Sequence, residues 1–378
     1  MLKPESESEL RGIVAEASGP LRVMGGGTRP LGAPVEGEKL TTSDIQGIEL
    51  HEPDALTMVA RAGTAVADIE KALSMERQRL AFEPIDHRRL LGTSGTPTIG
   101  GVFAANASGP RRIQCGAARD FLLGVKFVDG RGNLIRNGGR VMKNVTGYDL
   151  VKLMAGSYGT LGIMTEVSFK VMPMSRAAGT LLFRNLSDAD AINALSKALG
   201  SPFEITGAAH VQKEVGGFQK TLVRVEGTEK SIRYRCEKLC GELAEFGSCE
   251  LLFDQDQVTK IWQDIRDVAA FENRDGDVWR ISVKPTDAPG IVAGLNDAEA
   301  IYDWGGGLVW ILLSDKTGIN DLRRSVIAAG GHATLVRGDA TRGAFQSAPA
   351  AVAAIEEGLR GKFDPRGILN PGLMRRTA

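Results

Sequence analysis

The sequence predicts an α+β fold with a first domain of two α/β lobes and a smaller domain of antiparallel sheet and helices. From Thr98 to Pro173, short β-rich runs are separated by glycine clusters, which let a backbone turn sharply or approach another group closely. From Arg176 onward the composition shifts to alternating strands and helices. We expect a first domain over residues 1–175, a smaller domain of antiparallel sheet and helices over 176–340, and a C-terminal segment over 341–378.

The composition excludes several classes of function. The 378 residues sum to a formal net charge of +0, so the chain has no general attraction to nucleic acid or anionic lipid. No apolar run is long enough to span a bilayer. The acidic start, MLKPESESEL, lacks the basic and apolar parts of a signal peptide. We expect a cytoplasmic protein with no transmembrane segment, which leaves room for docking on a membrane complex.

No metal site is predicted. Cys236 and Cys240 lie one turn apart on a predicted helix, but a zinc or iron–sulfur site needs more soft ligands. The basic residues around them are typical of a solvated helix face. The histidines form no paired ligand motif; they are His51, His87, His210 and His332.

The first lobe alternates strands and helices. Ser6 or Ser8 can cap a helix that Gly19 and Pro20 end. A helix over Val66–Met75 carries an apolar stripe, with Asp68 near its start. The expected strands are Leu21 to the glycines at 25–27, Leu40–Thr42, Ile48–His51, Thr57–Ala62 and Leu80–Phe82, the last ending at Glu83 and Pro84.

The triple glycine at Gly25, Gly26 and Gly27 follows the first strand directly. Consecutive backbone N–H groups in such a loop can form a concave nest for phosphate oxygens. The contiguous glycines do not match the spaced dinucleotide fingerprint, and no GK[ST] follows. A plain turn is an equally good interpretation of this stretch taken alone.

The ordered combination of motifs resembles the flavin-binding domain of the vanillyl-alcohol oxidase / PCMH family. The motifs are GGGT, EPDALTMVARAGTAVADIEKAL, FEP, TIGG, AANASGPRR, RDFLLG and GSYGTLGIMTEVSFKVMP, with FDPRGILNPG near the C-terminus. GPRR, RDFLLG, VMKNVTGYDL and LMAGSYGTLG are together similar to the FAD-binding subunits of bacterial glycolate oxidases. The resemblance is strong over Leu21–Pro173, good over the last twenty or so residues, and limited to layout between them.

The resemblance implies an FAD site between two domains. Two glycine-rich turns are expected to hold the pyrophosphate, and other residues to contact the ribityl chain, the adenine end and the ring. The first turn is Gly25, Gly26, Gly27, Thr28 and Arg29; the second is Thr98, Ile99, Gly100 and Gly101; the others are Asn106, Ser108, Gly109, Gly162, Ile163, Pro84 and Asn370.

The same resemblance predicts that the FAD is bound non-covalently. Relatives that tether the flavin use a His in the first glycine loop, at the position of Gly27, or a Cys upstream of TIGG, near Gly95 or Thr96. None of these residues can form that bond. Cys115 lies just past the flavin motif, and burial as a small residue is its simpler interpretation.

The second domain is expected to be a split βαβ cap with an antiparallel sheet. Ser187 caps a helix that Gly200 ends, and a second pass of strands and helices follows. The predicted strands are 179–185, 203–211, 221–227, 249–253, 278–284, 299–303, 307–314 and 332–337, with helices over 187–200, 228–246, 256–271, 288–295 and 320–329.

Removal of a hydride from a 2-hydroxy acid needs a cation for the carboxylate and a base for the hydroxyl proton. The candidates are Arg337 and His332 in GGHATLVRG, Arg280, with Lys284 four residues on, and His87 near the expected ring. For each, a solvated surface residue is the alternative. The GDGN-type metal motif of related D-2-hydroxy-acid dehydrogenases is absent from the sequence.

Three functions remain open at this point. The first is an FAD-bearing subunit of glycolate oxidase that works with a sister flavoprotein and an iron–sulfur subunit, attached peripherally to the inner membrane through them. The second is a self-sufficient FAD-dependent dehydrogenase for a small hydroxy acid. The third is an assembly subunit that keeps the fold without the chemistry. The intact glycine loops and the missing metal motif favour the first.

Overall fold

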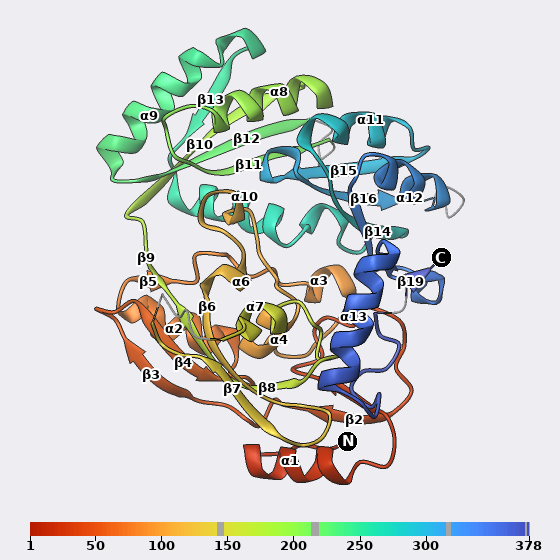
Figure 1. Cartoon of the computed structure of the whole chain (residues 1–378). Coiled ribbons are helices and arrows are strands. Elements are labelled where there is room, and N and C mark those ends of the chain that lie inside the picture. Colours follow the sequence, from red (N-terminus) through yellow and green to blue (C-terminus); the bar gives the residue numbers. More distant parts are fainter. Residues whose placement is uncertain (142–146, 213–218, 315–318, 375, 378) are drawn as a thin grey trace.

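The computed structural model describes residues 1–141, 147–212, 219–314, 319–374 and 376–377. It has a lower part built on a five-stranded sheet and an upper part built on a ten-stranded sheet (Figure 1). The chain passes between them after β9 (Met172–Pro173) and enters β10 (Ala177–Arg184). The C-terminal helix α13 (Ala350–Phe363) runs back down beside the lower part.

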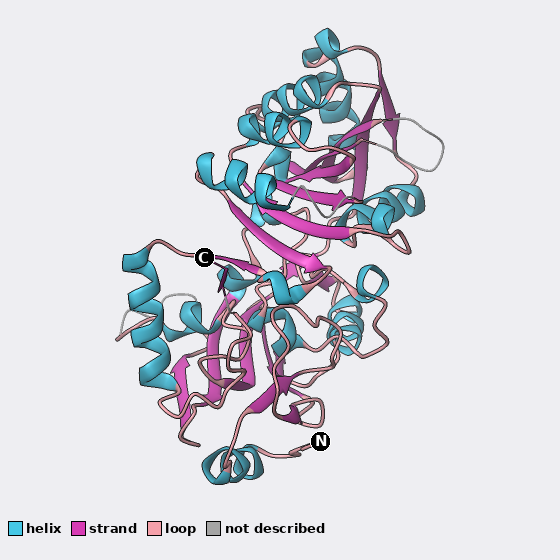
Figure 2. Cartoon of the chain, turned by 90° about the vertical axis from the view of Figure 1, so that its right-hand side faces the viewer, coloured by secondary structure: helices cyan, strands magenta, loops and turns pink. Residues whose placement is uncertain are grey.

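The lower part holds an antiparallel sheet in the order β3-β4-β8-β6-β7 and a parallel pair, β1-β2. Its helices are short and pack mainly on one face of the sheet (Figures 1 and 2). Its elements are α1 (Glu7–Glu16), β1 (Leu21–Met24), β2 (Glu38–Thr41), β3 (Ile48–Glu52), β4 (Thr57–Arg61), α2 (Val66–Met75), β5 (Gln78–Arg79), α3 (Arg88–Leu91), α4 (Ile99–Ala104), α5 (Arg112–Cys115), α6 (Ala118–Phe121), β6 (Leu122–Val128), β7 (Leu134–Gly138), α7 (Leu150–Met154) and β8 (Ile163–Lys170).

Local sequence explains the first two longer helices. The Ser6 hydroxyl accepts a hydrogen bond from the Glu9 N–H at 3.2 Å, and Leu10 and Val14 bury one face of α1. Helix α2 has the predicted bounds and buries Val66, Ile69 and Leu73, as its apolar stripe predicts.

The upper part contains two βαββαβ units joined edge to edge. The first is β10, α8 (Asp188–Leu199), β11 (Ile205–Val211), β12 (Lys220–Gly227), α9 (Glu229–Glu242) and β13 (Cys249–Leu252). The second is β14 (Asp277–Ser282), α11 (Ala288–Ala293), β15 (Ala298–Asp303), β16 (Leu308–Leu313), α12 (Ile319–Ala328) and β17 (His332–Arg337). Antiparallel pairing of β11 with β15 joins them, and β18 (Phe345–Gln346) and β19 (Arg376–Thr377) extend one edge. This topology confirms the expected antiparallel cap and its second pass.

The two faces of the ten-stranded sheet have different coverings. Side chains of α8, α9, α11 and α12 pack on the outer face. The inner face packs against α10 (Gln255–Arg266) and against Leu31, Ile85 and Leu90 of the lower part. Because side chains alternate along a strand, Arg224, Arg280 and Asp303 project from this inner face, toward the lower part.

Three predicted elements are wrong. Leu80–Phe82 is a turn whose apolar side chains enter the core, with Phe82 packed against Phe103 and Phe121. The helix expected to reach Phe271 ends at Arg266, because Val268 takes a positive φ of 57°. The strand expected to reach Lys284 ends at Ser282, so exposed Lys284 does not share a strand face with Arg280.

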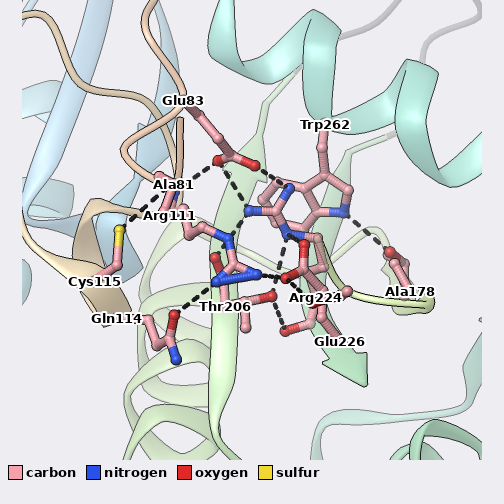
Figure 3. A network of polar contacts seen from close by, with 12 residues as sticks. Ala81, Glu83, Arg111, Gln114, Cys115, Ala178, Thr206, Arg224, Glu226 and Trp262 are labelled. Carbon is pink, nitrogen blue, oxygen red and sulfur yellow. Dashed lines mark hydrogen bonds and ion pairs between the residues drawn. The ribbon is translucent and has the colours of Figure 1, made fainter. Parts of the chain in front are cut away.

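A buried ion-pair network ties the two parts together (Figure 3). Glu83 of the lower part forms a bidentate pair with Arg224 on β12, at 2.9 and 3.0 Å, and accepts the Arg111 N–H at 2.9 Å. Arg111 also pairs with Glu226 on β12, and Arg79 reaches the same carboxylate at 2.9 Å. Burial alone would raise the pKa of Glu83, but Arg224 and Arg111 outweigh it and hold the pKa below its usual value.

We expect Arg224→Met to lower the free energy of unfolding by about 3–5 kcal/mol, because Glu83 then keeps a buried charge without its main partner. The matched control is Arg184→Met, which removes the exposed pair with Glu250 and costs about 0–1 kcal/mol. Urea unfolding followed by tryptophan fluorescence measures both. Equal midpoints for the two variants would contradict the role of the network.

Candidate functional site

A trough lies on the upper side of the lower part, and two adjoining cavities form it. They share Val23, Met24, Gly25, Gly101, Ala104 and Tyr158 as lining residues. Parts of segments 23–29, 97–105 and 158–164 supply most of the lining, with Asn370 and Leu373. The predicted cofactor residues that line this trough are Gly25, Gly26, Gly27, Thr28, Arg29, Thr98, Gly100, Gly101, Gly162, Ile163 and Asn370.

The first glycine loop needs glycine for a packing reason. A Cβ on Gly26 would stand 1.6 Å from the Thr96 carbonyl oxygen, and one on Gly95 would stand 1.7 Å from the Gly26 carbonyl oxygen. The two loops therefore touch backbone to backbone, which no side chain at either position permits. Gly27 is different, because its φ of 71° favours glycine while the space beside it is open.

The donor set of this loop fits the cofactor's pyrophosphate. Among the described residues, no acceptor takes a hydrogen bond from the backbone N–H groups of Gly26, Gly27 and Thr28. Successive unpaired N–H groups in a concave loop bind anionic oxygens. The loop thus has the chemistry of a phosphate nest, and a plain turn explains it less well.

The second glycine motif was expected to hold the pyrophosphate, but its N–H groups are bonded within the protein. Thr98 caps α4, and its hydroxyl accepts the Gly101 N–H at 3.3 Å. The N–H groups of Ile99 and Gly100 already donate to the carbonyls of Thr64 and Ala62, at 2.9 and 2.8 Å. The motif instead packs α4 closely on the sheet, since a Cβ on Gly100 would stand 2.6 Å from the Ala62 side chain. Ile99 points into the core and does not line the trough.

Asn370 closes the trough from the C-terminal segment. Its amide oxygen accepts the Val23 N–H at 2.7 Å, and its amide nitrogen donates to the carbonyls of Val23 and Tyr158, at 3.1 and 2.9 Å. One buried side chain thereby joins β1, the Tyr158 turn and the C-terminus. Its polar atoms serve the protein backbone, so its contact with the cofactor would be through packing.

Four further predicted cofactor residues lie outside the lining of the trough. Asn106 and Ser108 accept the N–H groups of Arg119 and Ala118, both at 2.8 Å, and so fix the start of α6. Gly109 packs against Glu83 and Arg266, where a Cβ would clash, and its carbonyl accepts the Trp304 indole N–H at 3.0 Å. Pro84 is buried in the turn beside Glu83. These residues build the domain boundary, and a direct role toward FAD stays a prediction.

A cationic cluster, which consists of Arg29 and Arg280 around His87, borders the trough where the two parts meet. Arg29 lines the trough, donates from Nε to His87 Nδ1 at 2.8 Å, and donates to the Ile85 carbonyl at 2.9 Å. Burial, Arg29 and Arg280 lower the pKa of His87 well below 6.5, so the ring is neutral. Because Nδ1 accepts from Arg29, the proton of the neutral ring is on Nε2. His87 therefore offers a hydrogen-bond donor and no free acceptor for a substrate proton.

Tyr158 belongs to both parts of the molecule. It lines the trough with φ at 53°, while its ring packs on Phe345 at 5.4 Å and against the cores of the ten-stranded sheet. Burial raises the pKa of its phenol, against the charges of Arg280 and Arg29. The residue stands out in GSYGTLG only as a large side chain among small ones, a signal too weak to mark it as a site residue.

The three predicted catalytic residues separate in space. Arg280 projects toward the lower part, with its guanidinium 5.2 Å from the Trp304 ring centre. Arg337 donates to the carbonyls of Leu90, Phe271, Arg274 and Gly276 and so holds loops together. His332 is exposed at the start of β17. Arg280 alone of the three keeps a position suited to a bound anion.

The described residues include no group of three His, Cys, Asp or Glu side chains placed to hold a metal ion. Cys240 and Cys249 form a disulfide, and Cys236 is buried in the upper core. Cys115 donates to the Ala81 carbonyl at 3.2 Å, and burial raises its pKa to about 11. A thiol with that pKa is a poor nucleophile, which supports its interpretation as an unreactive residue. No helix in the described part of the chain has the length and apolar character of a membrane span.

Comparison with known proteins identifies the class and then the family. Residues 1–138 match a family model described as an FAD binding domain. The solved structure of p-cresol methylhydroxylase with substrate bound aligns with a TM-score of 0.72 at 15% identity, covering 99% of this chain and 88% of that one. The chain thus carries an FAD binding domain and has the fold of p-cresol methylhydroxylase.

Two curated relatives narrow this class. The glycolate oxidase subunit GlcE of Escherichia coli is 36% identical over 358 residues, 94% of this chain and 92% of that protein. The glycolate oxidase subunit GlcD of Bacillus subtilis is 34% identical over 179 residues, 46% of this chain and 36% of that protein. The chain belongs to the family of the glycolate oxidase subunit GlcE. The expected α+β fold, FAD as cofactor and the class of FAD-dependent oxidoreductases are confirmed.

We expect Gly26→Ala to weaken FAD binding at least about tenfold, because the new methyl group must push the two loops of the trough apart. Flavin fluorescence during titration of the apoprotein measures the dissociation constant. Gly12→Ala is the control, since nothing lies within 4 Å of that Cβ. An unchanged dissociation constant in Gly26→Ala would contradict the assignment of this loop.

Asp303 makes stability depend on pH. Burial raises its pKa to about 7, against the hydrogen bond from the Trp304 N–H and the charges of Arg224 and Arg280. Because the folded pKa exceeds the unfolded value of 3.8, this group stabilises the fold most at low pH and the contribution is lost as pH rises to about 7. Asp303→Asn should therefore raise the melting temperature by several degrees at pH 8 and by clearly less at pH 5.

Thermal unfolding at both pH values measures this difference, with the exposed Asp321→Asn as control. An equal gap between Asp303→Asn and the wild type at pH 5 and pH 8 would show that Asp303 titrates normally.

Proposed function

We propose that this chain is the FAD-binding subunit of a glycolate oxidase and takes part in oxidising glycolate, a 2-hydroxy acid, to glyoxylate, with the electrons passed on to an acceptor. The observation that carries the proposal is the identity with the E. coli GlcE subunit over nearly the whole of both chains. The trough beside a cationic cluster supports it, because the substrate is a small anion.

The residues of the trough have separable tasks. The N–H groups of the loop at 26–28 would neutralise the pyrophosphate without a buried cation. Gly162 and Ile163 line the other end of the trough, where the adenine is expected. When bound non-covalently in this trough, FAD supplies the hydride acceptor.

Arg280 is the residue we assign to the substrate carboxylate. It projects from the inner sheet face toward the lower part, and the structure gives it no carboxylate partner among the described residues. His87 Nε2–H and the Tyr158 hydroxyl lie in the same cluster as neutral donors. The packed boundary, with Trp310 against His87 at 6.0 Å, limits the access of water.

The proposal includes partner subunits. Relatives named as subunits of glycolate oxidase support an assembly, and we propose a sister flavoprotein and an iron–sulfur subunit as its other members. A cytoplasmic location with peripheral attachment to the inner membrane through these partners remains part of the same proposal.

The test is an anaerobic visible spectrum of the purified chain, alone and co-purified with its partner subunits, before and after glycolate or D-lactate. We expect a yellow flavin band in the chain alone and its bleaching by glycolate in the complex. Bleaching by glycolate in the chain alone would contradict a subunit that depends on partners and would favour a self-sufficient dehydrogenase. A folded, colourless chain that takes up no FAD would overturn the proposal.

Arg280→Met should slow the bleaching of this chain's flavin by about a hundredfold, because the carboxylate loses a charged, hydrogen-bonding partner. Arg280→Lys should recover part of the rate, since a point charge replaces the planar fork. Arg324→Met on α12, whose side chain is 77% exposed, is the control. A bleaching rate in Arg280→Met equal to that of the wild type would show that Arg280 does not bind the substrate carboxylate.

A further inference from the structure

Two arginines at the domain boundary share one indole ring. The guanidinium carbon of Arg112, from α5 of the lower part, lies over the Trp304 ring at 4.4 Å from its centre. That of Arg280, from β14 of the upper part, lies over the same ring at 5.2 Å. Cation–π contacts hold each group in place and leave its in-plane N–H donors available for an anion.

The other arginines at this boundary have carboxylate or carbonyl partners, although the Nε groups of Arg79 and Arg111 have no hydrogen-bond partner among the described residues. Arg79, Arg111 and Arg224 pair with Glu83 or Glu226. Arg266 pairs with Asp267, and Arg337 donates to four carbonyls. In the part of the chain that the structure describes, the side chains of Arg112 and Arg280 have neither a carboxylate nor a carbonyl within hydrogen-bonding distance.

The carboxylates whose charges act on Arg112 and Arg280 accept hydrogen bonds from other groups. Asp303 accepts the Trp304 N–H at 2.7 Å, and Asp120 accepts the Ala117 N–H at 2.8 Å. Burial lowers the pKa of both arginines, that of Arg280 to about 10, because each charge is only weakly compensated. The charge of Arg112 also lowers the pKa of Arg280, so the two half-buried cations repel, and a bound anion would remove that cost.

Trp304 is fixed from both parts of the molecule. Its indole N–H donates to the Gly109 carbonyl at 3.0 Å, and its backbone N–H is bound by Asp303. Trp304, Gly305 and Gly306 all have positive φ, at 53°, 68° and 101°. A tryptophan in this conformation is strained, and such strain persists where the surrounding structure holds a functional geometry.

We infer that Arg112 and Arg280 form a two-arginine clamp on Trp304 that binds the carboxylate of the substrate, with one guanidinium from each part of the chain. The inference rests on the proposed function and deepens it, because it makes Arg112 a second anchor for a small 2-hydroxy acid. The clamp lies close to the trough, since Arg29 of the trough donates to His87, and the His87 ring packs against Trp310, which lies opposite Arg280 in the β14–β16 pair. The substrate carboxylate would thus be held beside the bound FAD.

Binding of oxalate, a small carboxylate that cannot be oxidised by hydride removal, tests the clamp. Oxalate is titrated into FAD-loaded protein, and the shift of the flavin absorbance gives the dissociation constant. We expect Arg112→Met to raise this constant at least about tenfold with an unchanged FAD content. The double variant with Arg280→Met should bind little worse than either single variant, because both side chains hold one carboxylate.

Arg119→Met is the matched control, because Arg119 lies on the neighbouring α6 and its side chain is 48% exposed. Arg112→Lys should keep part of the affinity, because it retains the charge without the planar fork. If Arg112→Met does not fold, Arg112→Gln takes its place as the charge-removing variant and is compared with Arg112→Lys. Oxalate affinity equal to the wild type in the charge-removing variant, or no oxalate binding by the wild type, would overturn the clamp.

The two proposals fail in different ways. If the wild type binds oxalate but glycolate never bleaches its flavin, even in the complex, the proposed function fails and the clamp stands. If glycolate bleaches the flavin while Arg112→Met binds oxalate as the wild type does, the clamp fails and the proposed function stands.

Discussion

The buried network of Glu83, Arg111, Arg224 and Glu226 is the constraint on which the rest of this structure depends. The trough is lined by the lower part and the C-terminal segment, and its cationic border takes Arg29 from the lower part and Arg280 from the upper part. A boundary between two such units is usually mobile unless it is large or strongly held. Charges that are satisfied only when the two parts are in register fix that boundary, because any sliding leaves a buried carboxylate without its arginine.

The network also divides the arginines of the boundary into two groups. Arg79, Arg111 and Arg224 form ion pairs with the carboxylates of Glu83 and Glu226, and these pairs hold the boundary together. Arg112 follows Arg111 directly in the chain, yet its side chain stacks on Trp304. Adjacent residues on a single turn thus serve two purposes, one closing the boundary and the other facing the site.

Sequence motifs were sufficient to predict many of the residues that line the trough, but not the residues at its cationic border. Gly25, Gly26 and Gly27 follow a strand directly, and LNPG carries Asn370, so local pattern and family resemblance placed both. The occupied N–H groups of Ile99 and Gly100 could not be foreseen, because their acceptors, Thr64 and Ala62, lie more than thirty residues away in a different element. Leu80–Phe82 was taken for a strand because it is apolar, whereas a core-facing turn satisfies the same pattern.

The residues at the cationic border of the trough could not be predicted from the sequence for a related reason. Trp304 and Gly109 are 195 residues apart, and the packing of the upper part on the lower part brings them together. Arg280 was proposed because it was expected to share a strand face with Lys284, which lies beyond the end of that strand. Arg337 was proposed from the place of GGHATLVRG in the chain, and the loops use its donors. A cation on a strand is a candidate for binding only when its neighbours leave it unneutralised, and that property belongs to the assembled boundary. The physical signature of this site is therefore a deficit of carboxylates around Arg112 and Arg280, which the anionic substrate would supply.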